Sequence, residues 1–209
     1  MPIGYGILFH QKAVNWMYSS DPVPGLDGRV IYHPRGKVLG GSGSINALVY
    51  HRGQAGDYDD WAAAGNDGWS YADVAPHFEQ LETPPQDDPG APHLSVTDNS
   101  ADFHPMGSDF LEICRQGQLP VCDAPAREGT GITPYLTTTR DGQRCSSAKA
   151  FLRPAMRRRN LTVVTGAHVS RIGFEGTRAR SVSYSRNGQD FKVRAGAEII
   201  LAAGAVGSP

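Results

Sequence analysis

The chain has 209 residues, of which 39% are hydrophobic and 20% are charged, and its formal net charge is −1. A chain of this length forms one large domain or two small ones. The near-neutral charge gives no reason to expect nucleic acid as a partner, and no apolar run approaches the ~20 residues needed to cross a bilayer. The N-terminus lacks the features of a secretory signal peptide. We expect a cytoplasmic protein without an integral membrane segment, and peripheral membrane association of a longer parent stays open.

The first part of the chain contains few regular elements. Residues 1–35 lack a sustained hydrophobic period, apart from a short predicted strand at Val30–His33. A first helix is expected over DYDDWAAAG (57–65). Asp57 can cap its start, the alanines favour it, and Gly65 suits its C-terminal end.

A second helix is expected in WSYADVAPHFEQLE (69–82), where Ser70 and Asp73 can form a capping box. Pro76 would kink or delay this helix, because proline lacks the amide hydrogen. The following residues, 83–105, are rich in proline, aspartate and serine. Such a composition is typical of a linker or a surface excursion.

A third helix is expected in HPMGSDFLEICRQG (104–117), and Gly117 would end it. Its apolar side chains Met106, Phe110 and Ile113 recur at helical spacing. We expect this face to be directed inward, as in an amphipathic helix.

The last part of the chain changes from helical to strand-like patterns. A short helix, capped near Cys145, is expected over RCSSAKAFLRP (144–154) and would end at Pro154. Beyond it, Asn187-Gly188 is a strong hairpin signal. Four segments rich in β-branched residues and bounded by turns predict strands: LTVVTG (161–166), VSRIGF (169–174), RSVSYS (180–185) and FKVRAG (191–196).

The three cysteines are Cys114, Cys122 and Cys145, and no C-x-x-C occurs. An odd count argues against a disulfide framework. We expect buried or half-buried free thiols in a reducing compartment. No metal site is expected, because the clustered ligands of a zinc site are absent from the sequence.

The stretch GGSGS, Gly40 to Ser44, has the composition of a flexible linker, but its flanks are apolar. A linker needs solvated flanks, so we expect a packed turn. Glycine lets backbone amides approach a ligand closely, and a glycine–serine turn before a helix favours phosphate. A tight strand–turn–helix junction without a ligand fits the same residues, and the two interpretations stay open.

A second glycine turn ends the chain, in AEIILAAGA (197–205). Its continuous apolar run is typical of a strand buried on both faces, and the small-residue turn resembles a nucleotide site at a strand's carboxyl end. Two such turns favour a dinucleotide site. No G-x-G-x-x-G follows a strand, so the residues alone do not predict a complete dinucleotide domain.

The order of these motifs resembles the glucose–methanol–choline (GMC) family of flavoprotein oxidoreductases, in particular bacterial alcohol and choline dehydrogenase-like members. PRGKVLGGSGSINALVYHRG with GDYDDWAAAGNDGWSYADVAPHFEQLE is similar to the family's first signature region. RDGQRCSSAKAFLRPAMRRRNLTVVTGAHVSRI is similar to its middle, and AEIILAAGAVGSP to its second signature. The resemblance covers nearly the whole chain, in order.

The resemblance implies FAD as the cofactor and a small-molecule alcohol as the substrate. It implies an α/β fold with an α+β mixture, namely a partial FAD-binding Rossmann-like domain of GMC type with part of an antiparallel-sheet substrate domain. It divides the chain into a partial FAD-binding domain (1–82) with a flavin-wrapping loop (35–50), a linker and partial substrate-binding region (83–143), and a return to the FAD-binding domain (144–209).

Carried over position by position, the resemblance assigns residues to the cofactor. Val49 would lie near the isoalloxazine, the backbone of Val169 near the adenine, and Ala203 and Gly204 near the ribose and diphosphate. Gly43 stands where many members have Ser or Thr, so a side-chain hydrogen bond is missing there. The cofactor-binding residues expected from the resemblance are Arg35, Gly36, Val38, Gly41, Ser42, Asn46, Ala47, Val49, Val169, Ala203 and Gly204.

In the family, a histidine accepts the alcohol proton while hydride passes from the alcohol carbon to flavin N5. None of the seven histidines here matches that base, and no catalytic residue is expected before residue 209. His33 and His51 flank the loop but are better interpreted as surface or packing residues. We therefore expect an internal fragment that lacks both the G-x-G-x-x-G unit and the catalytic histidine and is inactive alone. A non-catalytic truncated product and an unrelated nucleotide-binding module are the alternatives, and the oligomeric state is left open.

Overall fold

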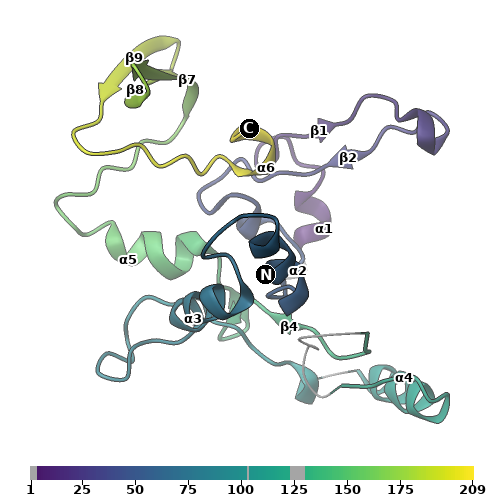
Figure 1. The fold of residues 1–209 in the computed structure, drawn as a ribbon. Coiled ribbons are helices and arrows are strands. Elements are labelled where there is room, and N and C mark those ends of the chain that lie inside the picture. The colour runs from purple at the N-terminus through teal and green to yellow at the C-terminus, as the bar shows by residue number, and fades with distance from the viewer. Residues whose placement is uncertain (1–3, 103, 123–129) are drawn as a thin grey trace. The chain divides into compact units, whose positions relative to one another are not determined.

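The computed structural model describes residues 4–102, 104–122 and 130–209 (Figure 1). The chain divides into two compact units, Met1–Arg157 and Arg158–Pro209, and each is described by itself. The first unit mixes short helices with short strands, the second has three consecutive strands followed by a short helix, and all of the named strands pair antiparallel. This arrangement confirms the predicted mixture of helices and antiparallel strands. Within the described residues, no helix is long and apolar enough to cross a membrane.

The first unit is built from short elements joined by long loops. Its α-helices are α1 (Tyr5–Leu8), α2 (Ala55–Ala63), α3 (Tyr71–Glu82), α4 (Pro105–Gln116) and α5 (Arg153–Ala155). Its strands are β1 (Tyr18–Ser19), β2 (Tyr32–His33), β3 (Val49–Tyr50), β4 (Leu136–Thr137), β5 (Thr139–Arg140) and β6 (Gln143–Arg144), which pair as β1–β2, β3–β4 and β5–β6. Short 3₁₀ turns span Pro24–Leu26, Gly41–Ser44 and Ser100–Asp102, and a π-helix spans Ala148–Leu152.

The two helices after the glycine loop start at capping boxes. Ser70 caps α3 and Asp73 closes the box, as predicted. The prediction that Asp57 caps α2 was wrong, because Gln54 is the capping residue. Asp57 occupies the third helical position, where its carboxylate accepts from the Gln54 amide at 3.0 Å. Pro76 lies inside α3 without delaying its start. Pro76 is the sixth residue of α3, where its ring removes the amide that would donate to the Ala72 carbonyl, and the helix still continues to Glu82.

Helix α4 begins and ends as predicted, but the expected inward face was wrong. Met106, Phe110 and Ile113 are 70%, 55% and 65% exposed, whereas Cys114 is buried. The helical spacing identified an apolar face correctly, but no described part of the chain covers it, so spacing alone could not tell which residues are buried.

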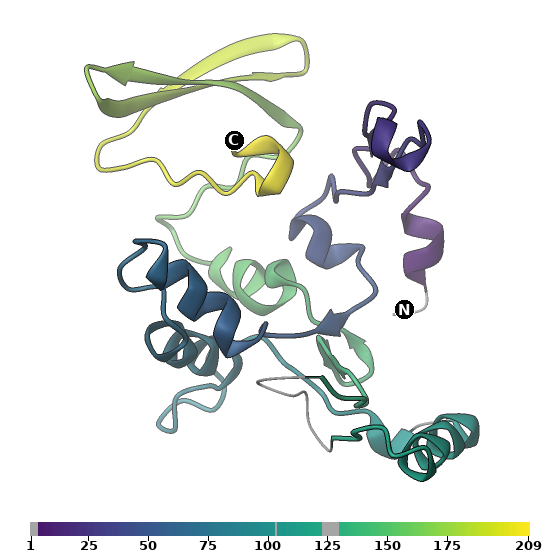
Figure 2. The same ribbon diagram turned by 45° about the vertical axis from the view of Figure 1, so that its right-hand side comes forward.

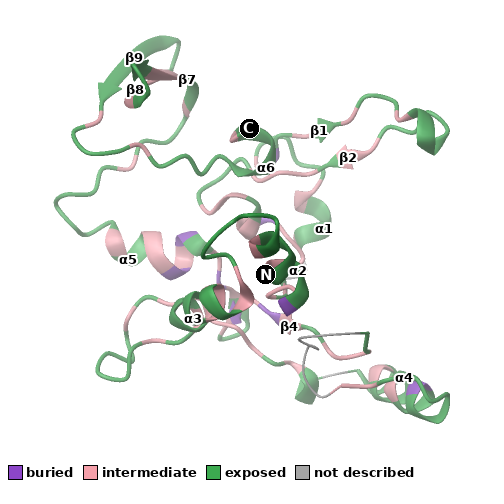
Figure 3. Ribbon diagram, in the orientation of Figure 1, coloured by how far each residue is buried: buried purple, intermediate pink, exposed green. Residues whose placement is uncertain are grey.

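The helix expected over residues 144–154 also differs. A π-helix spans Ala148–Leu152, and Pro154 lies within the following α5 instead of ending the helix. Ala148, Ala150 and Cys145 are buried there, as are Ile45 and Leu48 after the glycine loop, and buried residues are few along the ribbon (Figure 3).

The second unit is a three-stranded antiparallel meander (Figure 2). Its strands are β7 (Ala167–Glu175), β8 (Arg178–Arg186) and β9 (Gln189–Arg194). The predicted hairpin is confirmed, with Asn187 and Gly188 both at positive φ in the β8–β9 turn. The strand expected at 161–166 was wrong, because that segment forms no described ladder.

The apolar segment before the last turn is not a buried strand, contrary to the prediction. Residues 198–203 have no strand partner among the described residues, and Ile200 is 81% exposed and Leu201 50%. A strand exists only where a neighbour completes its hydrogen bonds, and an apolar run cannot supply that neighbour by itself. The chain then enters α6 (Gly204–Gly207).

Candidate functional site

A buried asparagine organises the entry to the glycine loop. The Asn15 side chain is only 2% exposed. Its Oδ1 accepts from the backbone amides of Met17 (3.0 Å) and Arg35 (2.9 Å), and its Nδ2 donates to the Phe9 carbonyl at 2.7 Å. A backbone bridge also joins Asn15 to Gly36. The predicted loop therefore starts from a fixed backbone.

The loop then folds back on its own first residues. Gly40 and Gly41 take positive φ angles of 85° and 54°, which glycine adopts without steric cost. The turn approaches Gly36 so closely that a Cβ there would lie 2.2 Å from the Gly41 carbonyl oxygen. The Ser42 hydroxyl accepts from the Gly36 amide at 3.1 Å. Gly36 is thus required by the fold of the loop itself.

One flank of the loop is packed and the other is exposed. Ile45 and Leu48, after the turn, are 3% and 4% exposed, whereas Val38 and Leu39, before it, are 37% and 45% exposed. A Cβ at Gly40 would lie 3.1 Å from the Ala148 Cβ. The expectation of a packed turn is therefore confirmed on the side that follows the glycines and wrong on the side that precedes them.

Arg144, at the end of β6, holds the loop from another part of the chain. Its Nη1 donates to the side-chain Oδ1 of Asn46 at 2.6 Å and to the Gly43 carbonyl at 3.2 Å, and its Nη2 donates to the Asn46 carbonyl at 2.7 Å. Burial lowers the pKa of the Arg144 guanidinium, because the interior disfavours its charge. These contacts span about a hundred residues of sequence, and no local pattern predicts them.

The loop leaves the core through a strained residue. Leu48 has φ of 71° and is buried, a conformation that is rare for residues other than glycine. The Asn46 Oδ1 accepts from the Leu48 amide at 3.0 Å and stabilises this turn. Val49, the next residue, is 51% exposed and begins β3. A buried anchor thus precedes an exposed apolar side chain.

Immediately after β3, an ion pair ties the chain to the end of α3. The Arg52 guanidinium binds both carboxylate oxygens of Glu82, Oε1 through its Nε and Oε2 through its Nη2. The Tyr50 hydroxyl donates to Oε1 of the same carboxylate. Burial and the hydrogen bond to Glu82 raise the pKa of Tyr50, and the Glu82 carboxylate raises the pKa of Arg52. The three side chains fix the exit of the loop.

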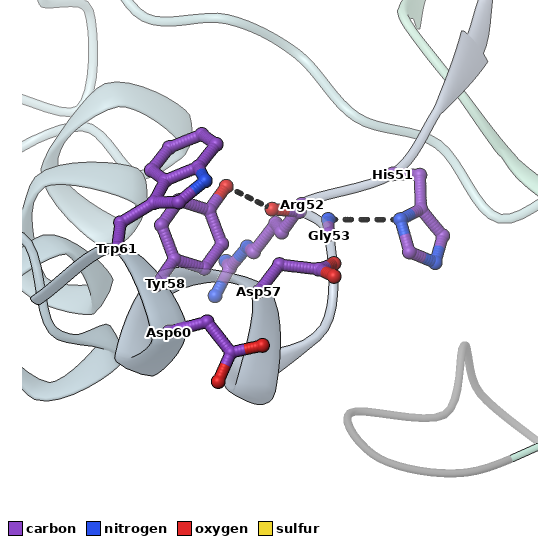
Figure 4. Close-up of a pocket in the computed structure, with 7 residues that line it drawn as sticks. All are labelled: His51, Arg52, Gly53, Asp57, Tyr58, Asp60 and Trp61. Carbon is purple, nitrogen blue, oxygen red and sulfur yellow. Dashed lines mark hydrogen bonds between the residues drawn. The ribbon is translucent and has the colours of Figure 1, made fainter. Parts of the chain in front are cut away.

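An open pocket of ≈ 530 Å³ lies at the turn from β3 into α2 (Figure 4). Tyr58 and Trp61 stand side by side in it, with ring centroids 5.3 Å apart, and the Tyr58 hydroxyl donates to the Arg52 carbonyl. Asp57 is engaged at the helix start. Asp60 and His51 are the other polar side chains that line the pocket. Since most of these groups already bond within the chain, we assign the pocket to the packing of the loop exit.

The three tryptophans are all partly exposed. Trp16, Trp61 and Trp69 are 40%, 49% and 51% exposed. Trp61 and Trp69 contact each other edge to face, and Lys37 lies 4.7 Å over the Trp16 ring. They form half-exposed aromatic contacts. All three cysteines are free, two of them buried and Cys122 half-buried, and the reducing compartment stays a prediction.

The histidines engage in local contacts. His51 Nδ1 accepts from the Gly53 amide at 2.8 Å, His104 caps α4, and His93 contacts Arg140. His33 is exposed in β2. Within the described ranges, no group of three or more His, Cys, Asp or Glu residues is placed to hold a metal ion.

The expected cofactor residues fall into two sets. Eight of them lie in the first unit on the single loop just described: Arg35, Gly36, Val38, Gly41, Ser42, Asn46, Ala47 and Val49. The other three belong to the second unit. Val169 is 53% exposed in β7, where the register with β8 shifts, and Ala203 and Gly204 form the turn into α6, with Gly204 at φ of 82°.

Sequence reasoning missed the residues that hold the loop. Asn15, Arg144 and Glu82 lie outside the glycine stretch, and each acts through hydrogen bonds to residues far away in sequence. Only Asn15 leaves a signal in the sequence, since it stands between Val14 and Trp16 and a polar side chain among apolar neighbours needs a partner when it is buried.

Comparison with known proteins places these features in a family. The family model described as GMC oxidoreductase matches residues 11–209. The mitochondrial choline dehydrogenase of Homo sapiens is 41% identical over 202 residues, covering 93% of this chain and 34% of its own length.

Two solved structures have the same fold. Pyridoxine 4-oxidase from Mesorbium loti superposes with a TM-score of 0.82 at 30% identity, over 92% of this chain and 39% of its own. An FAD-dependent oxidoreductase from Chaetomium thermophilum superposes with a TM-score of 0.81 at 28% identity, over 93% and 37%. The chain thus spans well under half the length of these proteins. With the match extending over nearly the whole sequence, the chain belongs to the GMC oxidoreductase family.

Proposed function

We propose that residues 35–50 bind FAD and that the protein containing them oxidises a small alcohol. Family membership and the FAD-dependent structural neighbour support FAD as the cofactor. The single observation that carries the proposal is the loop held by Asn15 and Arg144, which presents a fixed backbone of small residues.

The chemistry of the loop fits this group. A Cβ added at Gly41 or Gly43 would meet nothing within 4 Å, so the outer face of the turn is open. Val38 and Val49 expose apolar surface on either side of it. FAD combines a charged diphosphate with an apolar ring system, and an open turn of small residues between apolar side chains suits both parts.

In the proposed arrangement, each part of the loop has one task. Gly41 and Ser42 leave room for the diphosphate, and the side-chain amide of Asn46 donates a hydrogen bond to the cofactor. Val49 packs against the ring system and excludes water from it. The roles expected for Val169, Ala203 and Gly204 stay predictions. When bound, FAD supplies the acceptor for the hydride of the alcohol carbon.

The substrate class rests on the relatives' names. Choline and pyridoxine both carry a primary hydroxyl group, and proteins named for them resemble this chain. We therefore propose a primary alcohol as substrate. The choice between oxidase and dehydrogenase, the cytoplasmic location and the domain boundaries at residues 82 and 143 stay predictions.

We further propose that residues 1–209 alone do not turn over an alcohol. The base that takes the hydroxyl proton must reach the substrate at hydrogen-bond distance. His51, His93 and His104 are instead engaged with neighbouring groups of the chain. Loss of such a base lowers a rate by about 10²–10⁴-fold.

The test is to express the chain, titrate it with FAD while following flavin fluorescence, and then add choline or benzyl alcohol without oxygen. We expect saturable binding without bleaching of the flavin absorbance. Absence of saturable binding would contradict FAD as the ligand of this loop. Alcohol-dependent bleaching would contradict the proposed inactivity and would point to a base among the described histidines.

The second candidate is a poorly folded, non-catalytic product. The exposed apolar face of α4, with Met106 and Ile113, and the unpaired segment 198–203 favour it, because such surfaces promote association. Light scattering and a melting curve separate the candidates. Aggregation without a cooperative transition and without FAD binding would support the non-catalytic product. The GMC family membership excludes an unrelated nucleotide-binding module.

A further inference from the structure

We infer that Arg144 is a positioning residue that fixes the side-chain amide of Asn46 as a hydrogen-bond donor to the cofactor. The inference rests on the proposed function of the loop and goes beyond it, because it gives a role to a residue outside the loop. The starting observation is that Arg144 is half-buried and contacts the loop. Among the described ion pairs, its guanidinium pairs with no carboxylate.

The geometry settles which way the Asn46 amide is oriented. Two donors converge on one atom of its side chain, the Arg144 Nη1 at 2.6 Å and the Leu48 amide at 3.0 Å. Both can only donate, so the atom that they share is the oxygen. The Nδ2 group then forms the other arm of the planar amide and, among the hydrogen bonds of the described residues, makes none.

Arg144 also fixes the backbone that carries this amide. Its Nη2 bonds the Asn46 carbonyl, and its Nη1 reaches the Gly43 carbonyl. The planar guanidinium thus spans the last part of the glycine turn with three bonds at once, which the ammonium of lysine cannot reproduce in the same geometry. Hydrogen bonds from a charged group are also stronger than neutral ones.

The consequence for a ligand follows from the donor set. With its oxygen occupied twice, Asn46 offers the outside only an N–H donor. Such a donor suits the carbonyl oxygens of an isoalloxazine ring or a phosphate oxygen, and it excludes a role for Asn46 as an acceptor. Without Arg144 the amide can rotate, and the loop loses the bonds that hold residues 43–46 in place.

Four variants test the inference. Arg144→Met removes all three bonds, and Arg144→Lys keeps the charge without the fork. Asn46→Asp keeps the accepting oxygen but loses the donor. Lys149→Met is the matched control, because Lys149 lines the same ≈ 410 Å³ pocket as Arg144 but bonds Gln143 instead of the loop.

Two readouts separate loop order from cofactor contact. The first is hydrogen exchange of residues 40–48 without FAD. We expect Arg144→Met to accelerate exchange there by about 10-fold or more, since hydrogen bonds to charged groups contribute ~1.5–3 kcal/mol. Asn46→Asp should keep the wild-type hydrogen-exchange rate, because its side chain retains the accepting oxygen. Lys149→Met should keep it too, because this substitution removes no hydrogen bond to the loop.

The second readout is FAD affinity, with the flavin absorbance spectrum as a signature of the ring's surroundings. We expect both Arg144→Met and Asn46→Asp to weaken FAD binding by about 10-fold or more, as for the loss of a hydrogen bond to a ligand, and Lys149→Met to change it less than about 3-fold. Arg144→Lys should resemble Arg144→Met.

The outcomes are distinct. If Arg144→Lys binds FAD like the wild type, the residue acts through charge and the inference is overturned. If Asn46→Asp binds FAD like the wild type, Asn46 is not the donor to FAD, and the inference is overturned in this case too. If the wild-type chain does not bind FAD, the proposed function fails for this chain, and unchanged exchange in Arg144→Met would overturn the positioning role separately.

Discussion

The glycine loop and the three-stranded meander are held in opposite ways. In the meander, β7, β8 and β9 are consecutive in sequence and bond to one another through backbone ladders. In the loop, the backbone is irregular and is held by the side chains of Asn15 and Arg144, from residues well before and well after it.

This difference determines how each region responds to mutation. A ladder distributes its stabilisation over many backbone bonds, so one side chain contributes little. A loop held by single polar groups depends on each of them, because a buried donor or acceptor that loses its partner costs ~1–3 kcal/mol. The region that we propose to bind the cofactor is therefore the region most sensitive to single substitutions.

The largest effect is expected from Asn15→Ala. It would leave the amides of Met17 and Arg35 and the Phe9 carbonyl without this partner, and we expect a loss of about 3 kcal/mol. Urea unfolding followed by tryptophan fluorescence measures it, since Trp16, Trp61 and Trp69 all lie in the first unit.

The matched change in the second unit is Asn187→Ala, in the β8–β9 turn at φ of 52°. There we expect about 1 kcal/mol from the left-handed conformation alone, read from the circular dichroism of the strands. Equal losses in the free energy of unfolding for Asn15→Ala and Asn187→Ala would contradict the claim that the glycine loop depends on single side chains more than the meander does.

The next effect concerns two glycines of the same loop. Gly36→Ala would place a Cβ 2.2 Å from the Gly41 carbonyl oxygen, whereas Gly43→Ala meets nothing within 4 Å. We expect a loss of about 2–3 kcal/mol for the first and less than about 1 kcal/mol for the second. Thermal melting of both variants decides, and a stable Gly36→Ala would contradict the close turn.

A smaller effect is expected at the loop exit. Glu82→Ala would leave Arg52 half-buried without its carboxylate, with side-chain exposures of 26% and 12% in the pair. We expect about 2 kcal/mol, below the ~3–5 kcal/mol of a fully buried pair. Glu112→Ala breaks the exposed pair with Arg115, at 58% and 51% exposure, and should cost less than about 0.5 kcal/mol. Similar losses in both would show that the exit is not fixed by this pair.

The smallest effect is a pH dependence. The pKa of Tyr50 is raised in the folded chain by burial and by Glu82, so its contribution is fully present below its unfolded pKa of about 10. As the pH rises beyond that value, the unfolded state loses the proton first and stability falls. For this half-exposed group we expect about 0.5 kcal/mol per pH unit. Urea unfolding at pH 9 to 11 should show a steeper decline in the wild type than in Tyr50→Phe, and parallel declines would rule out Tyr50 as the cause.

The sequence predicted the locally determined parts of this molecule well. The Asn187-Gly188 hairpin and the Ser70 capping box follow from neighbouring residues, and both are confirmed. Burial was predicted poorly, as at Ile113 and Ile200, because apolar spacing marks a face and does not say what covers it.

The position of the candidate site was predicted from its glycines, but its support was not. Arg144 and Asn46 meet across about a hundred residues, and Asn15 reaches Arg35 from a segment that reads as irregular. Single polar residues leave no periodic trace in a sequence, so contacts of this kind become visible only in three dimensions.

The most direct test of the central proposal is to locate FAD on the chain by NMR, from the amide shifts of the ¹⁵N-labelled protein during a titration. The proposed site predicts the largest shifts at residues 36–49. Shifts confined to the pocket around Tyr58 and Trp61, or none at the glycine loop at saturating FAD, would contradict it.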